Sequence, residues 1–213
     1  GSEGFCYLNS AKIGAHLITV KMILTASRLS PRVCGMKETP AVEGERRYHH
    51  GDLRRALIDA ARRLLEVEGP SALSLRAVAR EAGVSPAAPY HHFKDKSELL
   101  EAVAYEGWQM LNAALAETRE HAQGRERLSL IGVAYVAFAR DHPYLYRVMY
   151  DTARDREGAP PTYEGGGPFS RVREALVEAG ADPSDAEGLQ LATVAAWCAA
   201  HGLAEMMIYP QFE

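Results

Sequence analysis

The sequence predicts an all-α fold, with a three-helix helix-turn-helix domain followed by a larger helical domain. Apolar residues recur every three or four positions through most of the chain, as on the buried face of a helix. No stretch shows the alternation that is typical of a half-buried strand. A chain of 213 residues is long enough for both domains to have a core. The expected boundaries are 1–44 for an N-terminal extension, 45–94 for the first domain and 95–213 for the second.

The first predicted helix covers residues 50–68. One face is apolar and the other carries four arginines. The apolar face consists of Leu53, Ala56, Leu57, Ala60, Ala61, Leu64 and Leu65. Gly69 followed by Pro70 is a typical helix end.

Two short helices joined by a tight turn are predicted next. Ser74 is a good N-cap for a helix that begins at Leu75. Gly83 supplies the left-handed backbone that a sharp turn requires. Ser85 as N-cap and Pro86 at the first helical position then open a second helix that runs to about Phe93.

A third helix should follow at once, because Asp95 and Glu98 form a pair like a capping box. The second helix carries small residues at its start and polar ones along one side, which suits an approach to base edges in DNA. Pro89 removes one backbone donor, and we expect it to shape the entry of this helix without breaking it. Helix pairs with a glycine turn also occur in proteins that never bind DNA.

Charge favours the DNA-binding interpretation. Residues 45–96 hold ten Lys or Arg and seven Asp or Glu, whereas residues 97–213 hold nine and eighteen. Phosphate binding needs such a local basic excess, whatever the sign of the whole chain. Arg46 and Arg47 form a short basic arm, which either reaches DNA or is a solvated linker.

Residues 48–104 resemble the N-terminal domain of TetR-type bacterial transcriptional regulators. The resemblance rests on LIDAARRLLEVEG, SLRAVAREAGVS and PYHHFKDKSELLEAV, with the run Tyr90, Phe93, Lys96 and Leu99 as its most specific part. It implies that Tyr90 and Lys96 contact phosphates, and that Phe93 and Leu99 are core residues. The other DNA-binding residues that we expect are Ser74 and Arg76, which would meet the DNA backbone, and the recognition-helix residues Ser85, Pro86, Ala87, Ala88, His91 and His92.

The second domain should hold a helix at 95–120. In the family, this helix links the DNA-binding domain to the effector-binding domain. Two helical pieces at 125–150 are separated near Pro143, and residues 151–168 are a loop by composition. A short helix at 169–179 ends at Gly180. The last helix runs from a capping box at Ser184–Glu187 to about Tyr209.

This last helix has no charged residue from Gly188 to Ala204. A membrane span is one interpretation, but Gln190, Thr193 and His201 interrupt the apolar run, so a buried helix is favoured. The resemblance implies a homodimer through residues 169–179 and 185–209. Trp197, His201 and Gly202 also resemble a Trp…His-Gly signature of one subgroup of the family.

Aromatic and Met residues of the second domain could line a pocket for a small-molecule effector, although residues of these types at helical spacing are more often plain core. The candidates are Tyr105, Trp108, Tyr135, Phe138, Tyr146, Met149, Trp197 and His201.

Catalysis and metal binding have little support, and we expect no catalytic residue, metal ligand or cofactor. The adjacent pairs His49-His50 and His91-His92 cannot each chelate one ion, because neighbours on a helix diverge. The three cysteines, Cys6, Cys34 and Cys198, have no metal spacing and fit a reducing compartment. A helical enzyme that uses the histidines and an adaptor that has lost DNA binding are the rival hypotheses.

The first 35 residues have no helix-turn-helix role, and we expect an extension or leader that is largely disordered. Taken together, the residues and the resemblance predict a cytoplasmic, nucleoid-associated bacterial regulator that is not inserted in a membrane. It would bind palindromic double-stranded DNA as a homodimer, most often as a repressor that an unidentified small molecule releases.

Overall fold

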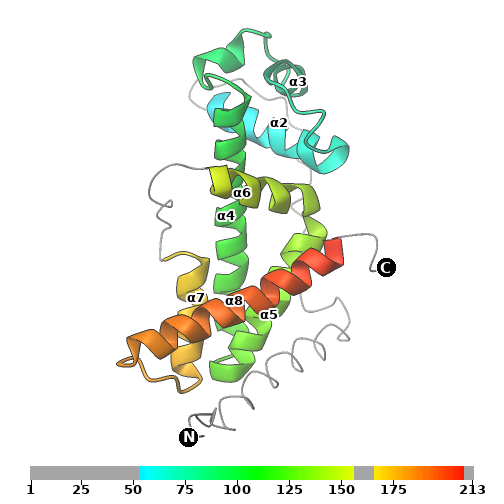
Figure 1. Ribbon diagram of the computed structural model, residues 1–213. Coiled ribbons are helices and arrows are strands. Elements are labelled where there is room, and N and C mark those ends of the chain that lie inside the picture. Colours follow the sequence, from blue (N-terminus) through cyan, green and yellow to red (C-terminus); the bar gives the residue numbers. More distant parts are fainter. Residues whose placement is uncertain (1–52, 156–165, 209–213) are drawn as a thin grey trace, which may run out of the picture. The chain divides into compact units, whose positions relative to one another are not determined.

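The computed structural model describes residues 53–155 and 166–208, and these residues are all-α, as predicted. No strand occurs within these two ranges. The elements in chain order are α2 (Leu53–Glu68), α3 (Leu75–Glu81), the 3₁₀ helix η2 (Ala88–His91), α4 (Lys96–His121), α5 (Gly124–Asp141), α6 (Pro143–Asp155), α7 (Pro168–Glu178) and α8 (Ala186–Ile208) (Figure 1). The predictions for residues 1–44, Arg46, Arg47 and the His49-His50 pair lie outside the described residues.

The helices group into two compact units, and α4 and α5 contribute to both. The first, which we call the reader unit, holds α2, α3, η2, α4 up to Ala113, the end of α5 and α6. The second, which we call the C-terminal unit, holds the rest of α4, α5 up to Ala137, α7 and α8.

In the reader unit, α2 packs on α3 and on α6. Its buried residues are Leu57, Ile58, Ala60, Ala61, Leu64 and Leu65, so the predicted face is correct except that Ile58 replaces Leu53 and Ala56. The helix ends where predicted, because Gly69 has a φ of 78° and its N–H donates to the Leu65 carbonyl at 3.0 Å.

Helix α6 fits closely against α4, because Gly107 presents no side chain. A Cβ at position 107 would lie 2.6 Å from the Met149 sulfur. Helix α6 also meets the end of α2: His142 Nδ1 lies 3.2 Å from Glu66 Oε1, and a Cβ at Gly69 would be 3.4 Å from the Tyr144 ring. The structure therefore includes α6 in the unit that contains the helix-turn-helix.

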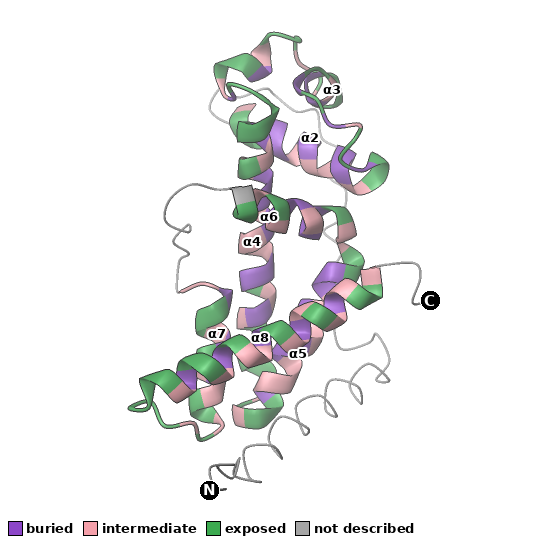
Figure 2. Cartoon of the chain, viewed as in Figure 1, coloured by how far each residue is buried: buried purple, intermediate pink, exposed green. Residues whose placement is uncertain are grey.

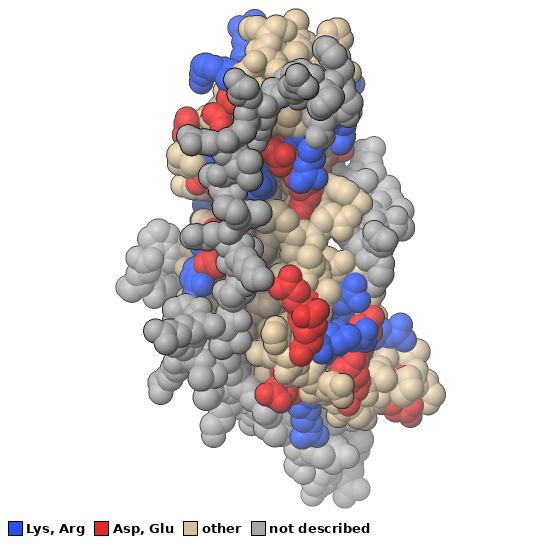
Figure 3. Space-filling view, turned by 180° about the vertical axis from the view of Figure 1, so that it is seen from behind, with Lys and Arg blue, Asp and Glu red and all other residues tan. Residues whose placement is uncertain are grey.

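The C-terminal unit is tied together by a buried cation. Arg127 at the start of α5 is fully buried and donates to Glu178 Oε1 at 2.6 Å and to Glu174 Oε2 at 3.4 Å, both on α7. Arg119 from α4 reaches the same two carboxylates at 3.2 and 3.3 Å. Charged side chains of both signs lie next to one another in Figure 3.

Helix α8 has two different faces (Figure 2). The buried face consists of Leu189, Thr193, Trp197, Ala200 and Ala204. The opposite stripe, Leu191, Val194, Cys198, Gly202 and Met206, is exposed. By length and composition α8 is apolar enough to cross a membrane, a test that soluble core helices also pass, yet only 22% of its most apolar window is buried within the chain. The prediction of a buried helix is thus correct for one face only.

Two other boundaries differ from the predictions. Residues 151–155, expected in a loop, continue α6. Asp185, not Ser184, caps α8, because the Gly188 N–H donates to Asp185 Oδ1 at 2.9 Å. Ser184 is engaged elsewhere: its hydroxyl and its N–H both donate to Asp182 Oδ1, at 2.7 and 2.8 Å.

Candidate functional site

The turn between α3 and η2 is built as the sequence predicts. The Ser74 hydroxyl accepts a hydrogen bond from the Ala77 N–H at 3.1 Å and caps α3. Gly83 follows α3 with a φ of 70°, and the Val84 N–H donates to the Ala79 carbonyl at 2.9 Å. This hydrogen bond, spanning the end of α3, closes the helix and sends the chain into a new direction.

The predicted recognition helix, Pro86 to about Phe93, is much shorter in the structure. Only Ala88–His91 are helical, and they form a 3₁₀ turn. Pro89 explains the difference, because it has no N–H and its ring would clash with the Ser85 carbonyl of an α-helix. The Ala88 N–H instead donates to the Ser85 carbonyl at 3.0 Å, and this bond between residues three positions apart is typical of a 3₁₀ turn. The expectation that Pro89 leaves the helix intact was wrong.

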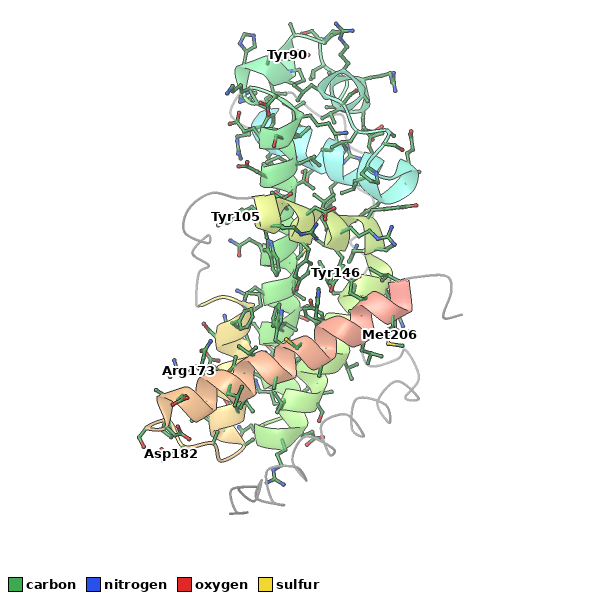
Figure 4. All side chains as sticks on the ribbon, viewed as in Figure 1. Tyr90, Tyr105, Tyr146, Arg173, Asp182 and Met206 are labelled. Carbon is green, nitrogen blue, oxygen red and sulfur yellow. The ribbon has the colours of Figure 1, made fainter. Side chains whose placement is uncertain are left out.

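The side chains of this segment still divide into a support and an exposed face. Phe93 and Leu99 are 1% and 0% exposed, which confirms the prediction that they are core residues. Tyr90 is 55% exposed and points away from that core (Figure 4). Of the other predicted DNA-binding residues, Ser74, Arg76, Ser85, Pro86, Ala87, His91 and Lys96 are exposed, and Ala88 and His92 are half-buried.

The start of α4 is held by a reciprocal cap, as predicted. The Glu98 N–H donates to Asp95 Oδ1 at 3.0 Å, and the Lys94 N–H donates to Glu98 Oε2 at 2.7 Å. Lys96, expected to contact phosphate, donates from Nζ to the Pro70 carbonyl at 3.1 Å and so also holds the loop after α2. The cap and this hydrogen bond fix where the exposed ammonium group lies.

Basic side chains project at the end of the reader unit that carries the helix-turn-helix (Figure 3). Arg76 and Arg80 are exposed on α3, and Lys94, which precedes α4, and Lys96, the first residue of α4, are also exposed. Arg54 lies over the Phe93 ring at 5.3 Å and is a support residue. Two exposed cationic groups thus flank the turn on either side, which suits contact with phosphates.

The predicted effector residues are divided between the two units. Five belong to the reader unit: Tyr105, Trp108, Phe138, Tyr146 and Met149. The rings of Trp108 and Tyr146 each pack on Tyr150, at 5.2 and 4.9 Å, and Met149 lies against Gly107. Tyr105 is 41% exposed and lines an open groove of about 950 Å³ between α2 and α4.

The other three, Tyr135, Trp197 and His201, meet in the C-terminal unit. Tyr135 contacts Trp197 edge-on, with ring centroids 5.0 Å apart. The Tyr135 hydroxyl and His201 Nδ1 are 3.0 Å apart. Phe169 of α7 completes this group by stacking on Trp197 at 4.3 Å. Sequence reasoning missed Phe169, because nothing in its spacing links the start of α7 to the middle of α8.

Two carboxyl groups of the reader unit have shifted pKa values. The hydrogen bond with His142, supported by the charge of Arg62, lowers the pKa of Glu66 against the effect of burial. Burial raises the pKa of Glu106, although Arg55 lies 2.7 Å from its carboxylate. Within residues 53–155 and 166–208, no group of three or more His, Cys, Asp or Glu is arranged to hold a metal ion.

A capped helix, a glycine turn and an exposed basic segment over a buried aromatic define a helix-turn-helix of the DNA-binding class. Two family models match the chain: "Bacterial regulatory proteins, tetR family" over residues 57–103, and "Tetracyclin repressor-like, C-terminal domain" over residues 128–213. The chain belongs to the TetR family and is a DNA-binding transcriptional regulator.

Solved structures agree on the fold. A protein of unknown function from Rhodococcus sp. RHA1 is 36% identical, with a TM-score of 0.60 over 76% of this chain and 85% of that one. A regulatory protein in the tetR family from Rhodococcus RHA1 is 23% identical, with a TM-score of 0.51 over 74% and 84%. BioQ, solved with its natural double-stranded DNA operator, is 22% identical, with a TM-score of 0.50 over 75% and 90%.

Proposed function

We propose that two copies of this chain bind a palindromic operator and repress transcription until a small molecule releases them. The observation that carries this proposal is the exposed segment Ser85–Lys96, which presents Tyr90, His91 and Lys96 over the buried Phe93. Solved relatives include one bound to its operator DNA. The protein acts by binding, in the bacterial cytoplasm and on the nucleoid, and not as an enzyme.

The roles within this segment follow from chemistry. Tyr90 and Lys96 carry a hydroxyl and an ammonium group, which bind phosphate oxygens of any sequence. Ala87 and Ala88 let the backbone approach base edges closely, and His91 offers a ring nitrogen to them. Ser74 and Arg76 at the start of α3 add further contacts to the DNA backbone.

Dimerisation follows from the exposed apolar side chains of α7 and α8. Leu191 is 70% exposed and Met206 is 50% exposed on one stripe of α8, and Val177 on α7 is 36% exposed. Contiguous apolar surface of this kind marks protein–protein interfaces. A second copy offers the same surface by symmetry, so α7 and α8, with residues 169–179 and 185–209, form a four-helix bundle across a two-fold axis. The two readers then lie about one helical turn of DNA apart, or about 34–36 Å.

Release requires that the effector change the spacing of the two readers. Helix α4 begins at the reader turn and contributes residues to the C-terminal unit. A ligand that favours a different tilt of α4 therefore shifts the dimer away from the spacing that fits the operator.

The test is a gel shift on the DNA that flanks the protein's own gene. Lys96→Gln keeps a donor for the Pro70 carbonyl but removes the charge, so we expect weaker binding to every sequence and a salt slope lower by about one. His91→Ala should change the preference among operator variants. Arg125→Ala, on an exposed part of α5, is the control. Unchanged DNA affinity and preference in both reader variants would contradict the proposal.

A further inference from the structure

The aromatic group of the C-terminal unit has one ring that is far more exposed than the others. Trp197 and Tyr135 are 8% and 2% exposed, whereas Phe169 is 44% exposed. Phe169 is the second residue of α7 and stacks on Trp197 with an interplanar angle of 21°. One face of the indole is therefore covered by a ring that itself remains half in water.

A cavity of about 20 Å³ adjoins the Trp197 ring. Its lining comes from α4, α5, α7 and α8: Leu115, Leu128, Ile131, Gly132, Tyr135, Val172, Ala196, Trp197 and Ala200. The hydroxyl of Tyr135 and the indole N–H of Trp197 are the side-chain polar groups of this lining. Such a volume is close to that of one water molecule, but a water there would find too few polar partners. Apolar cavities stay dry and accept apolar guests. This cavity can therefore take an apolar edge of a ligand that binds beside Trp197.

The same group has one polar edge. The Tyr135 hydroxyl and His201 Nδ1 lie 3.0 Å apart, and His201 follows Trp197 by one helical turn. Both side chains already have partners, so the hydrogen-bonding group of a guest would take the place of one of these partners. No Lys, Arg, Asp or Glu is among the cavity-lining residues, so the part of a guest that enters the cavity should be uncharged.

We propose that this group is the effector site, and that the effector is a neutral, flat aromatic molecule with one hydrogen-bonding substituent. Its ring takes the place of Phe169 on the face of Trp197 and extends into the adjoining cavity, and its substituent bonds to the Tyr135–His201 pair. This inference rests on the proposed function, because it names the chemical class of the effector.

Flatness follows from the geometry. Trp197 is met by one ring edge-on and by one ring stacked, the two arrangements that aromatic pairs prefer. A guest that replaces the stacked ring keeps that contact only if it is itself planar.

The experiment uses the intrinsic fluorescence of the full-length protein. The chain has two tryptophans, so Trp108→Phe leaves Trp197 as the reporter. The probes are phenol, cyclohexanol and benzene, with excitation at wavelengths that the probes do not absorb. Phenol should change the emission in a saturable way and bind about tenfold more tightly than cyclohexanol. His201→Ala should reduce the preference for phenol over benzene about fivefold.

Phe169→Ala separates this site from unspecific binding. It removes the ring that the guest displaces, so phenol should bind about threefold or more tightly. Glu117→Ala, at an exposed position of α4 outside the cavity lining and the proposed dimer surface, is the control and should leave phenol affinity unchanged. Circular dichroism establishes that the variants are folded, and Phe169→Leu, which keeps an apolar side chain but no ring, should behave like Phe169→Ala.

Two results would overturn the inference: no saturable change with phenol in either Trp108→Phe or its Phe169→Ala derivative, or equal affinity for phenol and cyclohexanol. A gel shift without any probe is run on the same preparation. If the protein binds DNA but not phenol, the effector site is wrong and the DNA-binding function stands. If it binds phenol but not DNA, the regulator function fails and the site stands.

Discussion

Arg127 is the largest fully buried side chain in the described part of the protein. Its guanidinium meets Glu178 and Glu174, while its Nε has no hydrogen-bond partner within residues 53–155 and 166–208. A buried cation of this kind is stable only while its carboxylates remain, because an uncompensated buried charge is costly. The arginine thus makes α7 necessary to the core of the C-terminal unit.

Glu178→Ala removes the shortest of these contacts and should lower the free energy of unfolding by about 2–4 kcal/mol. Glu126→Ala removes an exposed carboxylate one residue from Arg127 and should change it by less than about 0.5 kcal/mol. Urea denaturation of both variants measures the difference. Equal effects would show that the buried pair contributes no more than a surface charge.

Glu66 and Glu106 should give the protein opposite responses to acid. Because the pKa of Glu66 is lowered from its ordinary value of 4.5, its stabilising contribution is present above that pH and is lost as the pH falls below it. The destabilisation caused by Glu66→Gln should therefore shrink below a pH of about 4.5. The pKa of Glu106 is raised, so its contribution is fully present below 4.5 and is lost as the pH rises through the higher, folded-state value.

Denaturant unfolding of wild type, Glu66→Gln and Glu106→Gln at a series of pH values tests both signs. Relative to Glu106→Gln, the wild type should gain stability as the pH falls towards about 4.5, and relative to Glu66→Gln it should lose stability below that pH. If the free energy of unfolding has the same pH dependence in all three proteins, His142 does not lower the pKa of Glu66 and burial does not raise the pKa of Glu106.

Single residues were predictable where their role depends on near neighbours. Phe93 and Leu99 were predicted as core from a local motif, and both are buried. Arg127 and Glu178 lie 51 residues apart, and a sequence pattern at helical spacing carries no information about such a pair. The stacking of Phe169 on Trp197 was missed for the same reason.

At the scale of elements, the predicted helix at 95–120 compares with Lys96–His121 in the structure, and the break near Pro143 is where α5 gives way to α6. These limits are set by caps, prolines and periodicity, all of which are local. The recognition helix is shorter than predicted, because Pro89 interrupts the α-helix that the N-cap Ser85 favours. A proline four residues after the cap permits a 3₁₀ turn but not a regular α-helix.

Gly83 sets the geometry of the helix-turn-helix by its backbone alone. A Cβ at position 83 would meet nothing within 4 Å, so only its φ of 70° opposes substitution. Gly83→Ala should therefore destabilise the protein by about 1–2 kcal/mol, and Gly83→Asn should cost less, since Asn tolerates this region better. Thermal unfolding of both variants measures the effect, and a neutral Gly83→Ala would mean that the turn relaxes without cost.

At the scale of the whole molecule, α8 carries two apolar faces, and residues 53–155 and 166–208 bury only one of them. An apolar stripe that includes a 70% exposed leucine is unfavourable in water for an isolated chain. The proposed second copy removes this cost and, by the same contact, sets the distance between the two DNA readers. If operator recognition requires the dimer, a substitution on α8 that weakens dimerisation should also lower the affinity for operator DNA.

The most direct test is the stoichiometry and affinity of the complex with the DNA that flanks the gene, measured by analytical ultracentrifugation. Wild-type chains should bind each DNA site as pairs, and therefore in even numbers. Leu191→Glu should weaken pairing and DNA binding together, by about thirtyfold or 2 kcal/mol. Ala153→Glu, which adds the same charge at an exposed position of α6, should do neither. Single chains bound to the DNA, or equal binding by wild type and Leu191→Glu, would show that pairing through α8 is not required for DNA binding.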